Sequence, residues 1–266
     1  MFSQADFTDG IISGLIQHNP DASQLFQPKL VLNDSANGRK TLEFVLDNIR
    51  SCDSFVMAVA FVTRSGVACL HQTLKEFGQR GGRGQIMVST YLNFSDPTAI
   101  KALSNFAGID VSFVNEPNFH GKTYLFEHAN YAQIMIGSSN LTQNALGKNT
   151  EVNLGISVQR DSGLYLETVA QMDHWAGKAE TVSDQNLAAY EEAWKEAKQQ
   201  IRSTPPSIVP EEIFSEIAQS FQQPISSNTL KPNQMQVPAL EQLDAVREAG
   251  HRRSLVISAT GTGKTV

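Results

Sequence analysis

The chain has 266 residues, of which 41% are hydrophobic, and a mean hydropathy of −0.24. The length fits one large domain or two smaller ones, and the composition is ordinary for a soluble globular protein with a full-sized core. The formal net charge of −6 argues against nucleic-acid binding through bulk electrostatics, although a local basic cleft is compatible with it.

The sequence contains no signal for a membrane span or for export. The longest apolar stretch, residues 55–62, is far too short to cross a bilayer. The N-terminus lacks the basic region and the hydrophobic run of a signal peptide. Cys52 and Cys69 do not have metal-ligand spacing and are expected as reduced thiols, so we expect a cytoplasmic protein without a membrane partner.

Helices and strands alternate through the first half of the chain, after a segment, residues 1–40, that gives no clear pattern. In chain order the pattern predicts a helix from Thr41, a strand at 54–62, a helix ending at Gly78, a strand at 85–89, a helix beginning at Asp96-Pro97 and a strand at 110–115. This alternation is typical of an α/β domain.

A predicted antiparallel hairpin follows. Residues 123–126 and 133–136 are apolar or β-prone runs that a polar turn at 128–130 separates, and residues 151–158 form a further strand. The hairpin adds antiparallel pairs to the alternating pattern, so the sequence predicts a mixed β-sheet flanked by helices. His18 and His128 belong to no motif and are expected at the surface.

Polar side chains converge at one end of this hairpin. His120 and Lys122 are two residues apart on an extended segment and point to the same face. The hairpin carries the Gly-Ser-Ser-Asn stretch, with Ser138 and Asn140, back beside His120. An imidazole, an ammonium, a hydroxyl and an amide together predict a site for an anionic, oxygen-rich group such as a phosphate.

These residues resemble the phospholipase D superfamily, whose signature is His-x-Lys followed by Gly-Ser-x-Asn. The resemblance covers roughly residues 40–160, and Glu151 matches the acidic residue that supports the histidine in the family's nucleases. The family usually has an aspartate five residues after the lysine, where this chain has Glu127. The single His-x-Lys motif is similar to that of the small nucleases rather than the two-motif lipid enzymes.

The resemblance implies a metal-independent phosphodiesterase that acts on DNA or RNA. His120 would attack phosphorus, Lys122 and Asn140 would stabilise the non-bridging oxygens with help from Ser138, and Glu151 would orient the imidazole. A second histidine must protonate the leaving oxygen. No other histidine has a lysine two residues later, so we expect a homodimer that supplies two copies of His120 to one cleft.

Simpler explanations exist for each residue. Ser138 and Asn140 could cap the following helix. Glu151 could be a solvated carboxylate at a strand end. The alternative function is a catalytically inactive nucleic-acid-binding module that targets a helicase, and a lipid or phosphatidyl-transfer enzyme is a third possibility.

The C-terminal part begins with helices. Apolar residues recur there at spacings of three and four, which predicts a helix with one apolar face formed by Leu187, Tyr190, Trp194, Ala197 and Ile201. Residues 203–207 are expected to end this helix. A second helix is predicted at 211–222, and residues 223–228 are a predicted linker.

The last segment resembles the start of a superfamily 2 helicase. Residues 230–234 resemble the glutamine motif, with Gln234 as the adenine reader, and residues 258–265 resemble motif I after a predicted strand. Glycines there would cradle phosphates, Lys264 would reach the outer phosphates and Thr265 would hold Mg²⁺. The nucleotide-binding residues of this motif are Gly261, Gly263, Lys264 and Thr265.

The sequence ends at Val266, before the helix that would complete that phosphate site, so ATP and Mg²⁺ are expected only in a full-length helicase. No cofactor is expected for the nuclease. The predicted domains are a phospholipase D-like nuclease domain at residues 1–180, a helical extension and linker at 181–228, and an incomplete helicase motor segment at 229–266.

Overall fold

The structure is a computed structural model that describes residues 3–34 and 40–203. The chain divides into two units, residues 1–210 and 211–266, and every described residue belongs to the first. Gln234, Gly261, Gly263, Lys264 and Thr265, with the rest of the predicted helicase segment, lie outside the described residues. None of the described helices has the length and apolarity needed to cross a membrane.

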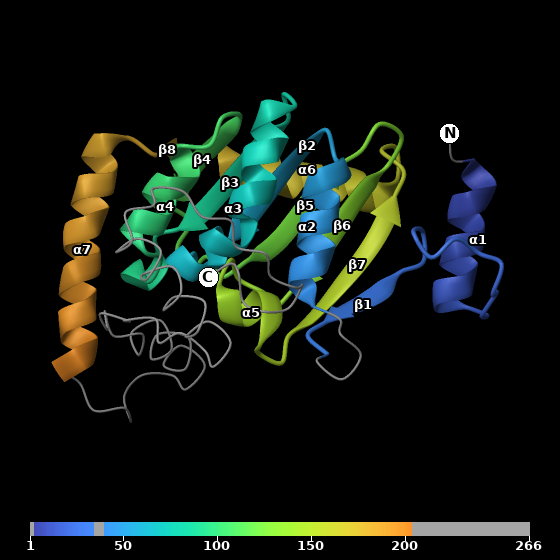
Figure 1. Ribbon diagram of the computed structural model, residues 1–266, viewed down its shortest axis with the longest axis horizontal. Helices are drawn as coiled ribbons and strands as arrows, with labels where there is room; N and C mark the ends of the chain where they lie inside the picture. The colour runs from blue at the N-terminus through green and yellow to red at the C-terminus, as the bar shows by residue number, and fades with distance from the viewer. Residues whose placement is uncertain (1–2, 35–39, 204–266) are drawn as a thin grey trace, which may run out of the picture. The chain divides into compact units, whose positions relative to one another are not determined.

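A mixed β-sheet forms the centre of the described unit (Figure 1). Its eight described strands run in the order β1-β7-β6-β5-β2-β3-β4-β8. β2, β3 and β4 are parallel to one another, and the other neighbouring pairs are antiparallel. The strands are β1 (Lys29–Leu32), β2 (Ser54–Val59), β3 (Arg83–Ser89), β4 (Ile109–Val114), β5 (Lys122–Glu127), β6 (Ala132–Gly137), β7 (Val152–Val158) and β8 (Ala179–Thr181).

Helices cover both faces of the sheet. In Figure 1, α2 and α3 lie in front of it and α6 lies behind. The helices are α1 (Gln4–Leu15), α2 (Thr41–Ser51), α3 (Arg64–Gln79), α4 (Pro97–Ser104), α5 (Gln143–Gly147), α6 (Gly163–Ala176) and α7 (Asp184–Ser203), with a short 3₁₀ helix, η1 (Tyr91–Asn93). The prediction of a mixed α/β sheet flanked by helices is therefore confirmed for this unit.

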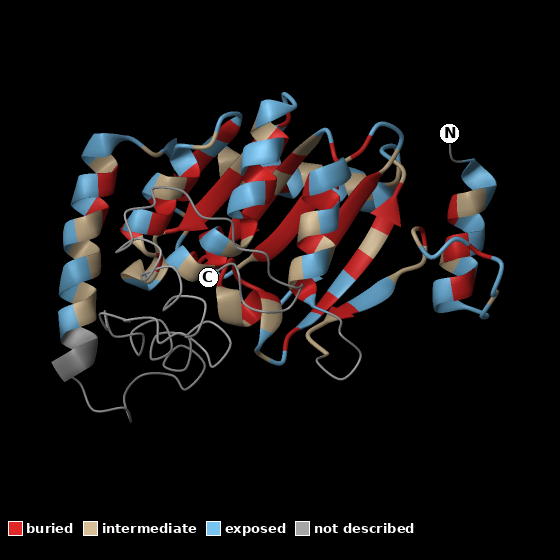
Figure 2. Cartoon of the chain, in the orientation of Figure 1, coloured by how far each residue is buried: buried red, intermediate tan, exposed pale blue. Residues whose placement is uncertain are grey.

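Alternating side chains divide the core into two layers. Phe55, Met57 and Val59 of β2 pack with buried residues of α2, α3 and α4 on one face. Ala58 of β2 packs on the other face, with Met172 of α6. The central strands are buried on both faces, whereas β7 alternates between exposed and buried residues over its first half and β1 begins with exposed residues (Figure 2).

The predicted hairpin is confirmed, with Thr123 of β5 opposite Ile136 of β6. The strand predicted at 54–62 is wrong at its end, because β2 stops at Val59 and residues 60–62 leave the sheet. β5 runs antiparallel to β2, with Lys122 opposite Val59. The end of β2, the start of β5 and the end of β6 therefore meet at one edge of the sheet.

Candidate active site

His120 and Lys122 lie at this edge, where the chain enters β5. The Lys122 Nζ atom is 2.9 Å from Nδ1 and 3.3 Å from Nε2 of His120, and it donates a hydrogen bond to the His120 carbonyl oxygen at 2.9 Å. Lys122 is buried, whereas His120 is exposed. The imidazole is thus accessible to a substrate, and the ammonium is held beneath it.

Ser138 and Glu151 face each other across the ends of β6 and β7. The Ser138 hydroxyl donates a hydrogen bond to Oε2 of Glu151, and its oxygen accepts the N–H of Val152 at 3.0 Å. Glu151 is only 7% exposed. The alternative of a solvated carboxylate at a strand end is therefore wrong, because this carboxylate is buried and hydrogen-bonded.

Asn140 is fully buried just beyond the end of β6. Its Oδ1 atom accepts a hydrogen bond from the N–H of Phe61 at 3.0 Å. Since a backbone N–H can only donate, this contact fixes which end of the side-chain amide is oxygen and directs the two N–H donors of Nδ2 elsewhere. The alternative that Ser138 or Asn140 caps the next helix is wrong, because Thr142 caps α5.

Phe61 connects this amide to the histidine. The Phe61 ring meets the His120 ring edge to face, with centroids 5.5 Å apart and planes at 68°. Its backbone holds Asn140, as described above, and its carbonyl oxygen accepts the N–H of Leu141 at 3.0 Å. Phe61, two residues beyond the end of β2, thus both packs against His120 and orients Asn140.

A buried polar group that the sequence analysis missed supports residues 138–140. Asn153 of β7 accepts the N–H of Ser139 on Oδ1 at 3.1 Å and donates from Nδ2 to the Ser139 hydroxyl at 2.9 Å. Tyr124 donates its hydroxyl to the Ser139 carbonyl oxygen at 2.9 Å. Burial, and secondarily the charge of Glu151, raises the pKa of Tyr124, so its hydroxyl stays protonated as a donor. An amide at a buried position of a predicted strand was the available signal for Asn153.

His128 and Glu127 lie at the opposite end of β5. The expectation that His128 is a surface residue is wrong: it is 5% exposed, lies 3.1 Å from Asn48 through Nε2 and Oδ1, and stacks on Tyr131 with ring centroids 4.4 Å apart. Burial lowers its pKa, so the neutral ring is favoured. Glu127 accepts a hydrogen bond from the Tyr165 hydroxyl at 2.7 Å, so its carboxylate has a structural contact at the end of β5 that lies away from His120. His18 is exposed, as expected.

The described residues do not form an evident metal centre. Within residues 3–34 and 40–203 there is no group of three or more His, Cys, Asp or Glu side chains arranged to hold an ion. The charged and polar groups at the site edge instead offer an imidazole, an ammonium and a carboxylate–hydroxyl pair. Such a set can bind an anionic oxygen group through the N–H donors of the imidazole and the ammonium.

Comparisons with known proteins identify the type of domain that carries these residues. A family model described as "Cardiolipin synthase, PLD-like domain" matches residues 45–176, which include all of the predicted catalytic residues. The chain therefore contains a phospholipase D (PLD)-like domain. No curated protein matches the chain.

The chain also has weak similarity to several solved structures. NucT from Helicobacter pylori is 18% identical with a TM-score of 0.47, and the match covers 59% of this chain and 99% of that one. Nuc from Salmonella typhimurium, titled a phospholipase D family member, is 21% identical with a TM-score of 0.47, and the match covers 59% and 100%. Phosphatidylserine synthase from Haemophilus influenzae is 15% identical with a TM-score of 0.47, and the match covers 66% of this chain and 45% of that one.

Proposed function

We propose that the PLD-like domain at residues 45–176 is a metal-independent phosphodiesterase that cleaves DNA through a phosphohistidine on His120. The observation that carries the proposal is the exposed His120 imidazole with the buried Lys122 ammonium 2.9 Å from it. A phosphate oxygen that enters this position accepts the ammonium protons in place of the ring nitrogen. The imidazole lone pair is then released for attack on phosphorus.

The reaction has two steps. A His120 nitrogen forms a bond to phosphorus while the bond from phosphorus to the leaving oxygen breaks, and a second histidine transfers its proton to that oxygen. Water then attacks phosphorus, the phosphorus–nitrogen bond breaks, and the second histidine takes a proton from the water. Together, the two steps return the enzyme to its starting protonation state.

Donors at the sheet edge stabilise the charge that develops on the non-bridging oxygens. Lys122 supplies a full positive charge from a buried position, and Asn140 supplies amide N–H donors whose direction the Phe61 N–H fixes. Donors held in place before reaction stabilise a transition state without reorganising, and one such donor contributes roughly 10²–10³-fold in rate. Ser138 assists, and Glu151 orients the His120 imidazole.

We propose a homodimer as the source of the second histidine. An exposed apolar patch on the α6 side of the sheet supports this. Leu30 of β1, Leu154 of β7 and Ile136 of β6 lie next to one another in a row across these strands. Their side chains are 59%, 46% and 46% exposed. Val152 extends the patch towards Glu151 with 55% exposure. An apolar face beside the site edge suits a two-fold contact that brings the two copies of His120 together.

The helicase assignment is a separate proposal that rests on sequence alone. In a longer polypeptide, Gln234 would read adenine, and residues 261–265 would bind ATP and Mg²⁺. Lys264→Ala in such a polypeptide should abolish ATP hydrolysis and leave DNA cleavage by the PLD-like domain unchanged. Loss of both activities in this variant would argue against two independent sites.

The nuclease proposal is tested with purified protein on plasmid DNA and single-stranded oligonucleotides, with and without EDTA. Cleavage should survive EDTA, and His120→Ala should lower the rate by at least about 1,000-fold. His18→Ala, which changes an exposed histidine, is the matched control and should leave the rate unchanged. Binding without cleavage in the wild type would favour the inactive nucleic-acid-binding alternative, and activity that needs added Mg²⁺ would refute the metal-independent mechanism.

A further inference from the structure

Ser95 holds the backbone on both sides of Phe61. It lies between η1 and α4, far from the site residues in sequence, and it is fully buried. Its Oγ accepts the N–H of Val62 at 3.1 Å and donates to the carbonyl oxygen of Ala60 at 3.4 Å. The segment that leaves β2 is thereby fixed where the Phe61 N–H meets Asn140.

The backbone of Asp96, next to Ser95, also holds residues 60–62. The N–H of Asp96 donates to the Val62 carbonyl oxygen at 2.9 Å. On the other side of residues 60–62, Asn140 and Leu141 make the contacts described for the active site. Residues 60–62 are therefore clamped between the candidate catalytic amide and Ser95.

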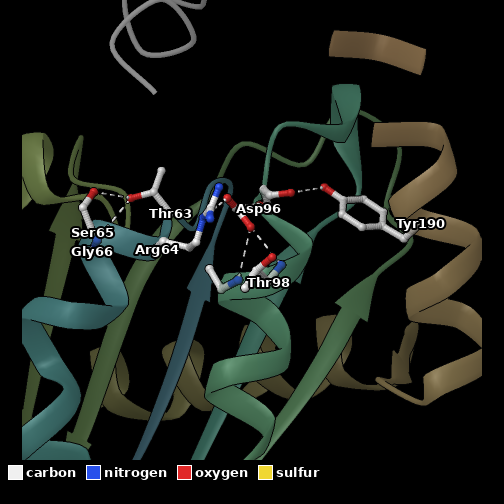
Figure 3. Close-up of polar contacts among 9 residues, drawn as sticks. Thr63, Arg64, Ser65, Gly66, Asp96, Thr98 and Tyr190 are labelled. Carbon is white, nitrogen blue, oxygen red and sulfur yellow. Dashed lines mark hydrogen bonds and ion pairs between the residues drawn. The ribbon is translucent and has the colours of Figure 1, made fainter. Parts of the chain in front are cut away.

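Ser95 is itself anchored by α7. The Tyr190 hydroxyl donates to the Ser95 carbonyl oxygen at 3.0 Å, and Figure 3 shows the ring of Tyr190 reaching from its helix towards the backbone beside Asp96. Tyr190 is 6% exposed. Burial raises its pKa, so the hydroxyl stays protonated and remains a donor at neutral pH.

The loop that carries Ser95 needs such anchors. Leu92 and Asn93 have φ values of 58° and 53°, in the left-handed region that residues with a Cβ adopt at a cost. Strained backbone of this kind persists only where the surrounding structure holds it in place. At the start of the loop, Ser89 donates to the carbonyl oxygen of Phe119, next to His120, and accepts the N–H of Tyr91.

We infer that Ser95 is a positioning residue for phosphodiester cleavage, and that Tyr190 of α7 anchors it. This inference rests on the proposed function for its effect on catalysis. Without the Ser95 hydroxyl, the buried Val62 N–H loses its acceptor, and the segment shifts to find another. The Phe61 N–H then moves relative to Asn140, and the amide donors are displaced from the phosphate oxygens.

The effect should appear in kcat rather than in KM, because the displaced donors act on the transition state. Ser95→Ala should lower kcat by about 10- to 100-fold with KM within about twofold of wild type. Ser112→Ala is the matched control: Ser112 is also buried, and its hydroxyl has no partner among the described residues. It should leave both constants unchanged.

A double-mutant cycle separates positioning from general damage. If Ser95 acts through Asn140, then Ser95→Ala should have almost no further effect on kcat once Asn140→Ala is present. Additive losses would overturn the inference. Tyr190→Phe should lower kcat by a smaller factor, about 3- to 10-fold, whereas Tyr165→Phe, which removes a hydroxyl at the opposite end of the sheet, should not.

Amide hydrogen exchange measured by NMR tests the same link without using activity. Ser95→Ala should speed exchange at the Phe61 amide at least about tenfold, and Ser112→Ala should not. Unchanged exchange at Phe61 would overturn the inference whether or not the protein cleaves DNA. Faster exchange in a protein that lacks cleavage would instead leave Ser95 as the support of Asn140 and refute the nuclease proposal alone.

Discussion

The Ser138 hydroxyl donates to the Glu151 carboxylate and accepts the N–H of Val152, so one oxygen joins the end of β6 to the start of β7. The contact places a buried negative charge beside the strand ends that hold His120 and Asn140. It also explains why a carboxylate can remain buried at this position, since buried charges need hydrogen-bond partners.

We expect Glu151→Gln to reduce DNA cleavage by about 10- to 100-fold, because the neutral amide forms weaker hydrogen bonds than the carboxylate. The unfolding midpoint should change little, since glutamine has nearly the same shape. Rates of plasmid cleavage measure the effect, with Glu167→Gln on the exposed surface of α6 as control. Full activity in Glu151→Gln would show that the charge at this position has no catalytic part.

Asn140→Asp tests the role of the amide donors. Aspartate keeps an oxygen to accept the Phe61 N–H but loses both N–H donors and adds a negative charge near the phosphate. Cleavage should fall at least about 100-fold, with substrate binding weakened as well. Asn130→Asp, in the exposed β5–β6 turn, is the control. A binding assay beside the rate assay separates the two effects, and a rate close to wild type would contradict the assigned role.

Gly66→Ala should damage the site through packing. A Cβ at Gly66 would come within 2.1 Å of the Leu141 carbonyl oxygen, directly after Asn140. The start of α3 must then move, at a cost of about 1–3 kcal/mol in the free energy of unfolding. Gly163→Ala is the matched control, because nothing lies within 4 Å of its added Cβ. Urea unfolding curves measure the difference, and equal stability of the two variants would contradict the close approach.

Stability should decline in alkaline solution because of Cys52. Burial raises the pKa of its thiol from 9.0 to about 12. Between these values the unfolded chain releases the proton and the folded chain retains it, so the free energy of unfolding falls as pH rises, by up to about 1.4 kcal/mol per pH unit. Cys52→Ala should flatten the profile between pH 9 and pH 10 in urea unfolding. An unchanged slope would mean that Cys52 ionises in the folded protein.

The dimer proposal predicts that a charge in the apolar patch separates the subunits. Leu154→Asp should give a monomer in sedimentation experiments and should lose DNA cleavage together with the dimer. Ile16→Asp changes a side chain that is 77% exposed on another part of the surface and should alter neither. A wild-type monomer with full activity would require a different source for the second histidine.

Much of the sheet could be predicted because its strands are long and strongly patterned. The β5–β6 hairpin followed from two apolar runs around a polar turn, and the start of α4 from Asp96-Pro97. β1 and β8 have only four and three residues, too short for a pattern to distinguish them from loops. The predicted strand at 54–62 was too long because its last three residues are apolar but are held by partners outside the sheet.

The proximity of the candidate site residues could be predicted where they are close in sequence. His120 and Lys122 are two residues apart, so strand geometry alone brings them together. Ser95 could not be found in this way, because its partners lie in other parts of the chain and nothing local marks it. For Asn153 the only local sign was an amide at a buried position of a predicted strand, which does not reveal its partner Ser139. The burial of His128 likewise depends on Asn48 in α2, which sequence pattern does not connect to it.

The pairing of β1 with β7 has a consequence for synthesis of the protein on the ribosome. Lys29 lies opposite Gly155, so the first strand has no partner until the seventh has been made. At roughly 5–20 residues per second, this delay is on the order of ten seconds. During that time β1 presents unpaired backbone groups, and we expect newly made chains shorter than about 160 residues to be especially sensitive to chaperones and proteases.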